Sequence, residues 1–517
     1  MAAESVGQGL QQVALSTAFD VHFPALEVVL PLVAAPLCFL FRSRAFARIL
    51  SAAVAWLTFG VALVLLQKVL AEGTVRYPLG GWAAPYGIEY RVTVAGAWVI
   101  LVVSLVAALT LLFDSRGSAS RLAPERRYLY YSAFLLCLAG LLGMAITGDL
   151  FNIFVFLEIS SLSSYALIAL GRDRRALMAS YSYLIMGTIG GGFFMIGVGL
   201  LYQMTGTLNV EDMAQRLPAV LDTRTVLVGF AFLLVGLSIK LAVFPLHQWL
   251  PNAYTFAPPR VSAFLAGTAT KVSYYVMAEV VFVLFGAHFV FTEIGLGAVL
   301  MPLSVAAMFV GSLAAIYQAD LRRLLAYSSI GQLGYMTLGL SLANVEGLTS
   351  GLVHVFNHGV TKSGLFLVVA CVGYRTGRTT VRSMAGLGTR MPATSLAFVI
   401  GGMSLIGVPG TAGFVSKWEL IRGALAAERL WLAAVVLVSS LLAVVYVWRV
   451  VEMIYFGRPE GLESLGRDGE PVREAPFSML LPTLILVAAT VVFGLWSDPT
   501  LSVARSAAVE LLGGAGG

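Results

Sequence analysis

The chain has 517 residues, of which 59% are hydrophobic and only 12% are charged, with a formal net charge of +6. Soluble globular proteins average about 25% charged residues, so the composition excludes one or two soluble domains and indicates a polytopic membrane protein. The positive charge does not indicate nucleic-acid binding, because the arginines lie in short loops between apolar segments.

The cysteines and the start of the chain exclude further classes. Cys38, Cys137 and Cys371 all lie in apolar segments without CxxC spacing. Neither a disulfide framework nor a zinc site is therefore expected. The first 23 residues lack a basic region ahead of an apolar core, so we do not expect a cleaved signal peptide.

Apolar windows long enough to cross a bilayer as helices of about 20 residues recur along the whole chain. In order they cover residues 24–41, 49–71, 93–113, 128–147, 149–170, 177–204, 226–248, 259–285, 293–317, 324–342, 346–374, 394–424, 430–457 and 477–498. The expected fold class is an all-α membrane protein with about 14 transmembrane helices.

Arginines follow every odd-numbered window. They are Arg42, Arg44 and Arg48, then Arg116, Arg121, Arg126 and Arg127, then Arg172, Arg174 and Arg175, then Arg260, then Arg322 and Arg323, then Arg375, Arg378, Arg382 and Arg390, and last Arg458, Arg467 and Arg473. The positive-inside rule puts these exits in the cytoplasm and both termini on the outer face of the cell inner (plasma) membrane. Residues 72–92 then predict an outer loop or short hairpin, and residues 458–476 predict a cytoplasmic loop.

The fifth window carries a carboxylate near its centre. Residues 148–170 read GDLFNIFVFLEISSLSSYALIAL, in which the acidic residue is Glu158. A charge at that depth costs at least about 2.5–3.5 kcal/mol, so Glu158 needs a partner or a function. The four serines between residues 160 and 164 allow a neighbouring helix to approach closely and supply hydroxyl groups.

The sixth window contains a glycine run, GTIGGGFF, from Gly187 to Phe194. A run of this kind can suggest a nucleotide-binding loop. Here it lies inside an apolar window with no preceding strand, so close packing between helices is expected instead.

Prolines interrupt the seventh and twelfth windows. Pro245 and Pro251 lie in GLSIKLAVFPLHQWLPNAY, and Pro409 lies in GMSLIGVPGTAGFVSKWEL. A proline frees a carbonyl about one turn earlier, here that of Leu241 and that of Leu405. Within a membrane such breaks persist only beside protein or a wet cavity.

The two breaks are five windows apart, and a repeat with an odd number of helices inverts its second copy. The expected organisation is therefore two inverted five-helix repeats with broken helices 7 and 12. Residues 1–127 would hold helices 1–3, residues 128–285 the first repeat, residues 293–457 the second repeat, and residues 477–517 the last helix and tail. This division into two repeats rests mainly on the paired proline breaks, because the positions of polar residues match only loosely between the two repeats.

Further ionisable residues lie inside the apolar windows. They are Lys240 and His247 around the first break, Lys271 in the eighth window, His354, His358 and Lys362 spaced four apart in the eleventh, and Lys417 after the second break. A lysine beside a carboxylate keeps its proton, and desolvation weakens its hold when the carboxylate turns away. A row of such groups can pass a proton laterally through water and histidine. The predicted pathway is Glu158, Lys240, Lys271, His354, His358 and Lys417, with His247 and Lys362 as secondary candidates.

Other interpretations exist for some of these residues. Lys68 and Lys362 could instead extend to the membrane interface, as lysines near helix ends do. His354 and His358 could bind a metal at their four-residue spacing, but no HExxH pattern is present and no metal site is predicted. Three glutamates stay open as buried partners or interfacial residues: Glu27, Glu279 and Glu452.

At these residues the chain resembles the antiporter-like membrane subunits of respiratory NADH:quinone oxidoreductase, membrane-bound hydrogenases and Mrp-type multisubunit cation/proton antiporters. The similarity covers about residues 80–460 and follows one order of motifs: GDLFNIFVFLEISSLSSYAL, SIKLAVFPLHQWLPNAY, TATKVSYYV, LRRLLAYSSIGQLGY, HVFNHGVTKSGLF and VPGTAGFVSKWEL. The resemblance implies fourteen helices with two inverted five-helix repeats. It also implies proton-translocating roles for Glu158, Lys240, Lys271 and Lys417, with His354 and His358 on the connecting axis.

Within this family the chain is most similar to the D-type subunits of Mrp antiporters. The similarity rests on GGWAAPYGI before the third window, SSYALIALG at the end of the fifth, VPGTAGFVSKW at the second break, and an end soon after the fourteenth window without a long lateral arm. Lys417 stands where some respiratory relatives have glutamate. The implied function is proton translocation in a multisubunit Na⁺/H⁺ antiporter. The alternative is a proton-pumping subunit of NADH:quinone oxidoreductase or of a membrane-bound hydrogenase or formate-linked complex.

Either function implies partners in the membrane. Those partners are other subunits of a hetero-oligomeric complex, and the translocated species are protons and monovalent cations, with no nucleic acid. The sequence contains no recognisable cofactor ligands or catalytic residues, so any redox centre would belong to partner subunits. A scaffold that merely kept the fold is a third possibility, which the cost of idle buried charges disfavours.

Overall fold

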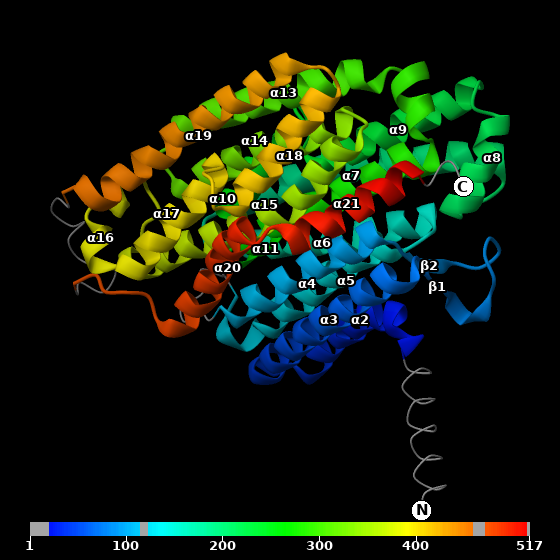
Figure 1. The fold of residues 1–517 in the computed structure, drawn as a ribbon. Coiled ribbons are helices and arrows are strands. Elements are labelled where there is room, and N and C mark those ends of the chain that lie inside the picture. Colours follow the sequence, from blue (N-terminus) through cyan, green and yellow to red (C-terminus); the bar gives the residue numbers. More distant parts are fainter. Residues whose placement is uncertain (1–19, 114–121, 459–470, 514–517) are drawn as a thin grey trace, which may run out of the picture.

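The computed structural model describes residues 20–113, 122–458 and 471–513. Nearly all of these residues lie in helices that run side by side in one bundle (Figure 1). The exception is a hairpin in which β1 (Val75–Pro78) pairs antiparallel with β2 (Glu89–Val92). The expected loop or short hairpin at residues 72–92 is therefore a hairpin. The chain start, most of residues 458–476, and Arg116, Arg121 and Arg467 lie outside the described residues.

The helices follow the predicted windows closely. The α-helices are α2 (Phe23–Phe41), α3 (Arg44–Glu72), α4 (Val94–Leu112), α5 (Tyr128–Ile146), α6 (Leu150–Ala169), α7 (Arg175–Thr205), α8 (Val210–Arg216), α9 (Arg224–Leu241), α10 (Trp249–Phe256), α11 (Pro259–Gly267), α12 (Ala269–Ala278), α13 (Leu296–Ile316), α14 (Leu321–Ser341), α15 (Val345–Thr376), α16 (Leu387–Arg390), α17 (Pro392–Ile406), α18 (Ala412–Ala426), α19 (Leu430–Phe456), α20 (Phe477–Leu495) and α21 (Asp498–Gly513). Two π-helical segments, η4 (Glu279–Leu284) and η5 (Phe289–Glu293), continue the chain after α12.

Eleven helices in the described ranges are long and apolar enough to cross a membrane. The chain is therefore an integral multi-pass membrane protein. Three predicted windows fall outside these eleven. Window 259–285 is divided among α11, α12 and η4, and window 394–424 is divided between α17 and α18. Window 324–342 forms α14, whose first turn contains Arg322 and Arg323.

Both proline-containing segments are interrupted where the sequence predicts. Helix α9 ends at Leu241, and Ala242 adopts the left-handed conformation with φ 60°. Helix α17 ends at Ile406, and Gly407 is left-handed with φ 87°. A third interruption, which we did not predict, separates α11 from α12 at Thr268, where φ is −125° and ψ is −61°. No proline marks this site, so the sequence carries no comparable signal for it.

The two ends of the bundle differ in composition. The arginine-rich end gathers loops from distant parts of the chain, as shown by the hydrogen bonds from Thr379 to Asp320 (2.7 Å) and from Arg375 to the Glu474 carbonyl (2.9 Å). The opposite end, here called the hairpin end, holds β1 and β2 (Figure 1). Its Thr74 hydroxyl donates to Glu510 at 3.0 Å.

The start of α2 also lies at the hairpin end, because His22 hydrogen-bonds the Tyr77 hydroxyl at 2.9 Å. The described chain thus begins and finishes at the same end of the bundle. Helix α21, which supplies Glu510, lies in the segment that we expected to be the tail after the last helix.

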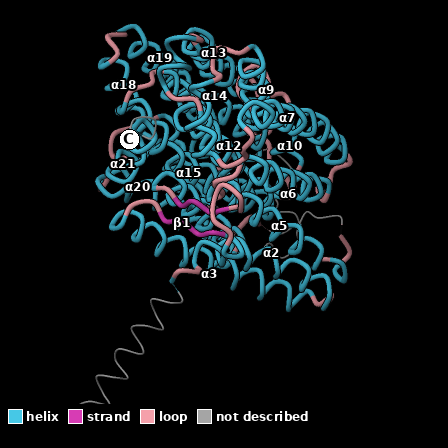
Figure 2. The backbone as a smooth tube through the Cα atoms, turned by 90° about the vertical axis from the view of Figure 1, so that its right-hand side faces the viewer, coloured by secondary structure: helices cyan, strands magenta, loops and turns pink. Residues whose placement is uncertain are grey.

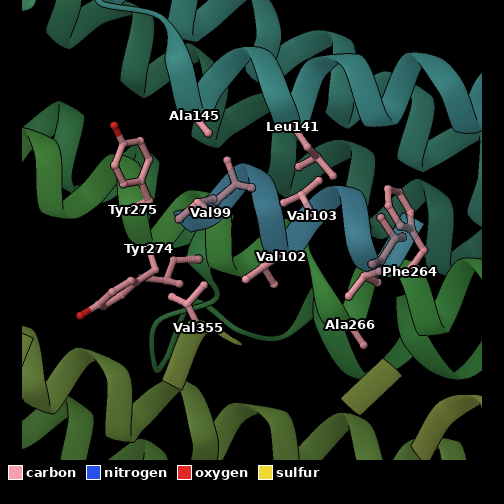
Figure 3. Packing of buried hydrophobic residues seen from close by; sticks show 14 of the residues in the cluster. Val99, Val102, Val103, Leu141, Ala145, Phe264, Ala266, Tyr274, Tyr275 and Val355 are labelled. Carbon is pink, nitrogen blue, oxygen red and sulfur yellow. The ribbon is translucent and has the colours of Figure 1, made fainter. Parts of the chain in front are cut away.

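Helix α15 forms the centre of the bundle. An apolar stretch of it is completely buried. Figure 2, turned by 90° from Figure 1, places α15 between α2, α3 and α5 on one side and α13, α14 and α19 on the other. Helix α4 lies beside α15. Figure 3 shows Val99, Val102 and Val103 of α4 among side chains of α5, α11, α12 and α15. By contrast, much of α3, α7 and α19 is exposed on the periphery. The polar groups of the central helices are therefore shielded from lipid.

Candidate functional site

The structure brings Glu158 and Lys240 together. Helix α6 carries Glu158, and Lys240 lies in the last turn of α9, beside the first break. The Lys240 ammonium lies 3.6 Å from a Glu158 carboxylate oxygen and donates to the Ser161 hydroxyl at 2.6 Å. The Lys240 side chain is 4% exposed and that of Glu158 is 24% exposed. An ion pair thus lies well inside an apolar bundle, and its acidic member retains access to the protein surface.

The glycine run of α7 makes room for this pair. A Cβ atom built on Gly191 would lie 2.2 Å from the Glu158 carboxylate oxygen. One on Gly187 would lie 1.8 Å from the Tyr165 hydroxyl. Only glycine allows α7 to approach α6 this closely, so the prediction of helix packing is confirmed.

Lys271 and Lys417 each place their ammonium group at a helix break. Lys271 is fully buried and donates to the carbonyl of Ala266, just before the α11–α12 interruption. Lys417 donates to the carbonyls of Leu405 (3.0 Å) and Ile406 (2.8 Å), at the end of α17. The Leu405 carbonyl is the one that the position of Pro409 predicts to be free. Carbonyls at a helix end lack intrahelical partners, so each break supplies acceptors for a buried cation.

His354, His358 and Lys362, which share one face of α15, lie between these two lysines. The rings of His354 and His358 stack with centroids 5.4 Å apart, and His354 Nδ1 lies 2.7 Å from the Ser416 hydroxyl. Lys362 is fully buried and donates to the Leu325 carbonyl at 2.8 Å. Its ammonium group therefore does not extend to the membrane interface. Lys68, on peripheral α3, is half-buried.

Charges and contacts connect these groups along the bundle. Lys271 and Lys362 interact electrostatically with His358, and Lys417 interacts with His354. Ser416, the partner of His354, immediately precedes Lys417. No hydrogen bond between described side chains joins Lys240 to Lys271. The structure therefore groups Lys271, His354, His358 and Lys417 on one polar axis, whereas Glu158 and Lys240 form a pair with no observed contact to it.

Several polar atoms along this axis are buried and have no hydrogen-bond partner among the described residues. They are His354 Nε2, both ring nitrogens of His358, Asn357 Oδ1, Thr349 Oγ1 and the Tyr274 hydroxyl. An unsatisfied buried group costs about 1–3 kcal/mol, and buried water is its usual partner. The axis therefore has the polarity of a hydrated path.

The remaining candidates lie in different environments. His247 lies in the first break, half-buried, with its ring 5.3 Å from that of Phe244. Glu27 is fully buried on α2, and neither of its carboxylate oxygens has a partner among the described residues. Glu452 is exposed on α19, and Glu279 is buried and ion-paired with Arg91. In the part of the chain that the structure describes, no three His, Cys, Asp or Glu side chains gather as a metal site would require.

Sequence reasoning did not single out three residues at this site. Ser416 hydrogen-bonds His354, and the Lys417 ammonium lies 4.6 Å from the centre of the Tyr335 ring. Ser440 accepts from Lys417 at 3.0 Å. Ser416 could have been noted as the neighbour of Lys417. Tyr335 and Ser440 carry no such signal, because serines and tyrosines occur throughout the apolar windows.

Comparison with known proteins gives a consistent result. The family described as NADH:quinone oxidoreductase/Mrp antiporter, TM, matches residues 147–443. The N-type subunit of NADH-quinone oxidoreductase from Desulforudis audaxviator is 42% identical over 500 residues, which cover 93% of this chain and 97% of that protein. The D-type subunit of the Na⁺/H⁺ antiporter from Alkalihalophilus pseudofirmus is 30% identical over 488 residues, covering 94% and 96%. A chain of the Mrp complex from Dietzia sp. DQ12-45-1b superposes with a TM-score of 0.86 at 28% identity, covering 96% and 98%.

Proposed function

Since the chain belongs to the NADH:quinone oxidoreductase/Mrp antiporter family, we propose that it is the proton-translocating subunit of a multisubunit Na⁺/H⁺ antiporter. Its partners are other membrane subunits of that complex, as in the complexes of its structural relatives. One observation carries the proposal: the bundle interior holds both the Glu158–Lys240 pair and a buried group of lysines and histidines that extends from Lys271 to Lys417.

The Glu158–Lys240 pair acts as the switch. While Glu158 faces Lys240, its negative charge holds the lysine proton. Glu158 is partly exposed and has room to turn toward another partner. When it turns, Lys240 is left as an uncompensated charge in a low-dielectric interior, and its proton moves through water to Lys271.

The second half of the axis completes the transfer. A charge on Lys271 repels a proton on His358, so Lys271 gives its proton up as His358 takes it, and the stacked rings pass it on to His354. Each ring accepts on one nitrogen and releases from the other. Lys417 then receives the proton at the second helix break and controls its exit.

The proposed topology has fourteen crossings. To the eleven helices that are long and apolar enough to span are added α11 with α12, then α14, and then α17 with α18. An even number agrees with a described chain that begins and finishes at one end of the bundle. Residues 128–285 and 293–457 form two inverted repeats, flanked by residues 1–127 and 477–517. The arginine-rich end faces the cytoplasm, which puts both termini outside the inner membrane.

The second candidate function is the same proton relay driven by electron transfer. The 42% identity to a protein named as part of NADH-quinone oxidoreductase favours it, because the identity to the Na⁺/H⁺ antiporter protein is 30%. Flavin or iron–sulfur groups would then belong to partner subunits.

Purification of the complex from its own membranes tests the proposal. We expect a colourless assembly of membrane subunits that, in proteoliposomes, moves protons in response to a Na⁺ gradient. Flavin or iron–sulfur absorption from soluble partners, together with proton movement that does not depend on a Na⁺ gradient, would instead establish the second candidate function.

Substitution of the switching pair tests the assignment of residues. Glu158→Ala and Lys240→Ala should each abolish proton movement while the complex still assembles, and Lys68→Ala on peripheral α3 should retain it. Full activity of both Glu158→Ala and Lys240→Ala would contradict the proposal.

A further inference from the structure

The hairpin end of the bundle contains a cavity of about 750 Å³ that the predicted pathway does not use. Its walls come from the hairpin, α8, the π-helical segments and α21. The charged residues that line it include Arg76, Arg91, Glu211, Glu279, Glu293 and Glu510. Four carboxylates face two guanidinium groups, and a concave site with an excess of negative charge concentrates cations, hydronium included.

Arg91 has two carboxylate partners in this cavity. It forms an ion pair with Glu279 and a second one with Glu211 at 3.2 Å, and Arg76 also reaches Glu211 at 2.5 Å. The Glu279 and Arg91 side chains are both 8% exposed, whereas Glu211 is 30% exposed. Arg91 can therefore bind Glu211 alone and release the deeper carboxylate.

The charges of this cluster determine the protonation states of Arg91 and Glu211. Burial alone would lower the pKa of Arg91, but the carboxylates of Glu279 and Glu211 raise that pKa above its ordinary value. Burial would raise the pKa of Glu211, but the hydrogen bond from Arg76 and the charge of Arg91 lower it below its ordinary value. Arg91 thus stays cationic and Glu211 stays anionic, so a change of partner moves a full charge.

Glu279 leads inward from the cavity to the proton axis. The Tyr275 hydroxyl donates to Glu279 at 2.9 Å and lies 3.4 Å from the Thr93 hydroxyl. Lys271, Tyr275 and Glu279 recur every four residues, so they share one face of α12 and its continuation.

A second, small cavity of about 10 Å³ is lined by both Tyr275 and Glu279. That volume is about the space one water molecule needs. Tyr275 does not line the large cavity, whereas Glu279 lines both. The order from the hairpin end inward is therefore cavity, Glu279, Tyr275 and Lys271.

We propose that this cavity is the mouth of a proton half-channel, in which the Arg91–Glu279 ion pair is the gate and Tyr275 is the link to Lys271. The inference rests on the proposed function and adds the route by which protons reach the axis from the hairpin end.

When Arg91 turns to Glu211, hydronium in the cavity gives its proton to the Glu279 carboxylate and becomes water. The protonated Glu279 then donates to the Tyr275 oxygen, while the Tyr275 hydroxyl proton passes through water to the neutral amine of Lys271, which becomes an ammonium group. Glu279 returns to its anionic form and pairs again with Arg91, so one proton has moved inward for each cycle of the gate.

Blocking the cavity tests the route without changing the gate. Gln215 is exposed and lines the cavity, and Ala219 is an exposed position four residues later that does not. The cysteines of the wild-type chain are buried. The whole complex is reconstituted in proteoliposomes and labelled on the hairpin side with a bulky maleimide that cannot cross the membrane. Labelling of the Gln215→Cys variant should reduce its proton movement to background. The same labelling of Ala219→Cys should leave it unchanged.

Full labelling of Gln215→Cys with undiminished proton movement would overturn the inference and leave the proposed function intact. If the unlabelled complex shows no proton movement, the proposed function fails, and the half-channel fails with it.

Two substitutions test the gate itself. Glu279→Gln and Tyr275→Phe should each lower proton movement by about 100-fold, the order of magnitude that a positioned proton-transfer group contributes. Asp222→Asn, at an exposed position of the same end outside the cavity lining, should retain it. Wild-type proton movement by both gate variants would contradict the assignment. If either variant fails to assemble, the maleimide experiment decides.

Discussion

The buried lysines differ in how their charge is compensated. Lys240 has a carboxylate within 3.6 Å. Lys271, Lys362 and Lys417 instead donate to backbone carbonyls. Among the described residues, no acidic side chain forms a salt bridge with any of these three lysines. Carbonyl dipoles compensate a charge only in part. A proton on one of these lysines therefore repels a proton on the next, so the relay favours single, sequential transfers.

At the residue scale, Gly191 offers a test of the switching pair that leaves both charged residues in place. A methyl group at this position would lie 2.2 Å from the Glu158 carboxylate oxygen, so Gly191→Ala should displace Glu158 from Lys240 and strongly lower proton movement. Gly192→Ala is the matched control, because its Cβ would meet nothing within 4 Å. Proton flux in proteoliposomes is the measurement, and wild-type flux in Gly191→Ala would contradict the assigned role of the pair.

The sequence was sufficient for some residue contacts and insufficient for others. A basic partner for Glu158 could be expected in advance, because an isolated membrane charge demands one, but the sequence offered several lysines and did not single out Lys240. The Leu405 carbonyl followed from the position of Pro409. Glu279 stayed open because its partner, Arg91, is 188 residues away and belongs to a hairpin rather than a helix. No local pattern contains such a contact.

At the element scale, the helix breaks determine where the relay lysines lie. The proline-containing breaks were predicted at residue level, because proline removes a specific hydrogen bond. The break at Thr268 was missed. There the Thr268 hydroxyl donates to the Phe264 carbonyl at 2.7 Å and Lys271 donates to that of Ala266, so side chains replace the lost backbone bonds. Polar side chains of this kind also occur in unbroken helices, which makes them a poor signal.

The glycines of the second break provide an element-scale prediction. Gly407 and Gly410 both adopt left-handed conformations, with φ of +87° and +85°, so alanine strains either position by about 1–2 kcal/mol. Only at Gly407 would the new Cβ also approach the Lys417 side chain, at 2.8 Å. Thermal unfolding should show a similar loss of stability in Gly407→Ala and Gly410→Ala, whereas proton flux should fall much further in Gly407→Ala. Equal flux in the two variants would show that the position of Lys417 is not critical.

Helix α21 shows a limit of reading membrane segments from hydropathy. Its sequence includes charged residues, and we expected only a tail there. In the structure Glu510 accepts from the backbone N–H of Val94 at 2.8 Å and so caps the start of α4. This contact spans most of the chain and could not be derived from the local sequence.

The ion-pair cluster of the hairpin end predicts a pH dependence of stability. The pKa of Glu211 is lowered from its ordinary value of 4.5, although burial opposes this, because Arg76 and Arg91 favour the anion. A lowered pKa stabilises the fold above about pH 4.5, and the contribution is lost as the pH falls through the folded-state pKa. Glu211→Gln should therefore lower the unfolding temperature near neutral pH more than under acidic conditions.

Arg76→Gln should act through the same contact. The double variant should then lose less than the sum of the two single variants, as interacting neighbours do. An effect of Glu211→Gln that is equal at both pH values would contradict the charge-based account.

At the scale of the whole molecule, apolar helices lie at the periphery and the helix with the buried polar residues lies at the centre. Helices α7, α19 and α20 are largely exposed and apolar, whereas α15 is buried and carries both histidines and a lysine. Composition and window spacing were enough to predict a helical membrane protein, and the resemblance of its ordered motifs, not the spacing, indicated the family. The central position of α15 was not predictable from its sequence. Its window is less apolar than the neighbouring windows, and hydropathy does not show how far a helix lies from the lipid.

The central claim is that the buried lysines together carry protons through this chain. The most direct test is proton flux in proteoliposomes of the assembled complex, with Lys240, Lys271 and Lys417 all replaced by Met and with Lys68→Met as the control. We predict that the triple variant assembles with its partners but moves no protons above background, while Lys68→Met matches the wild type. Undiminished flux in the triple variant would contradict the account and identify the chain as a scaffold.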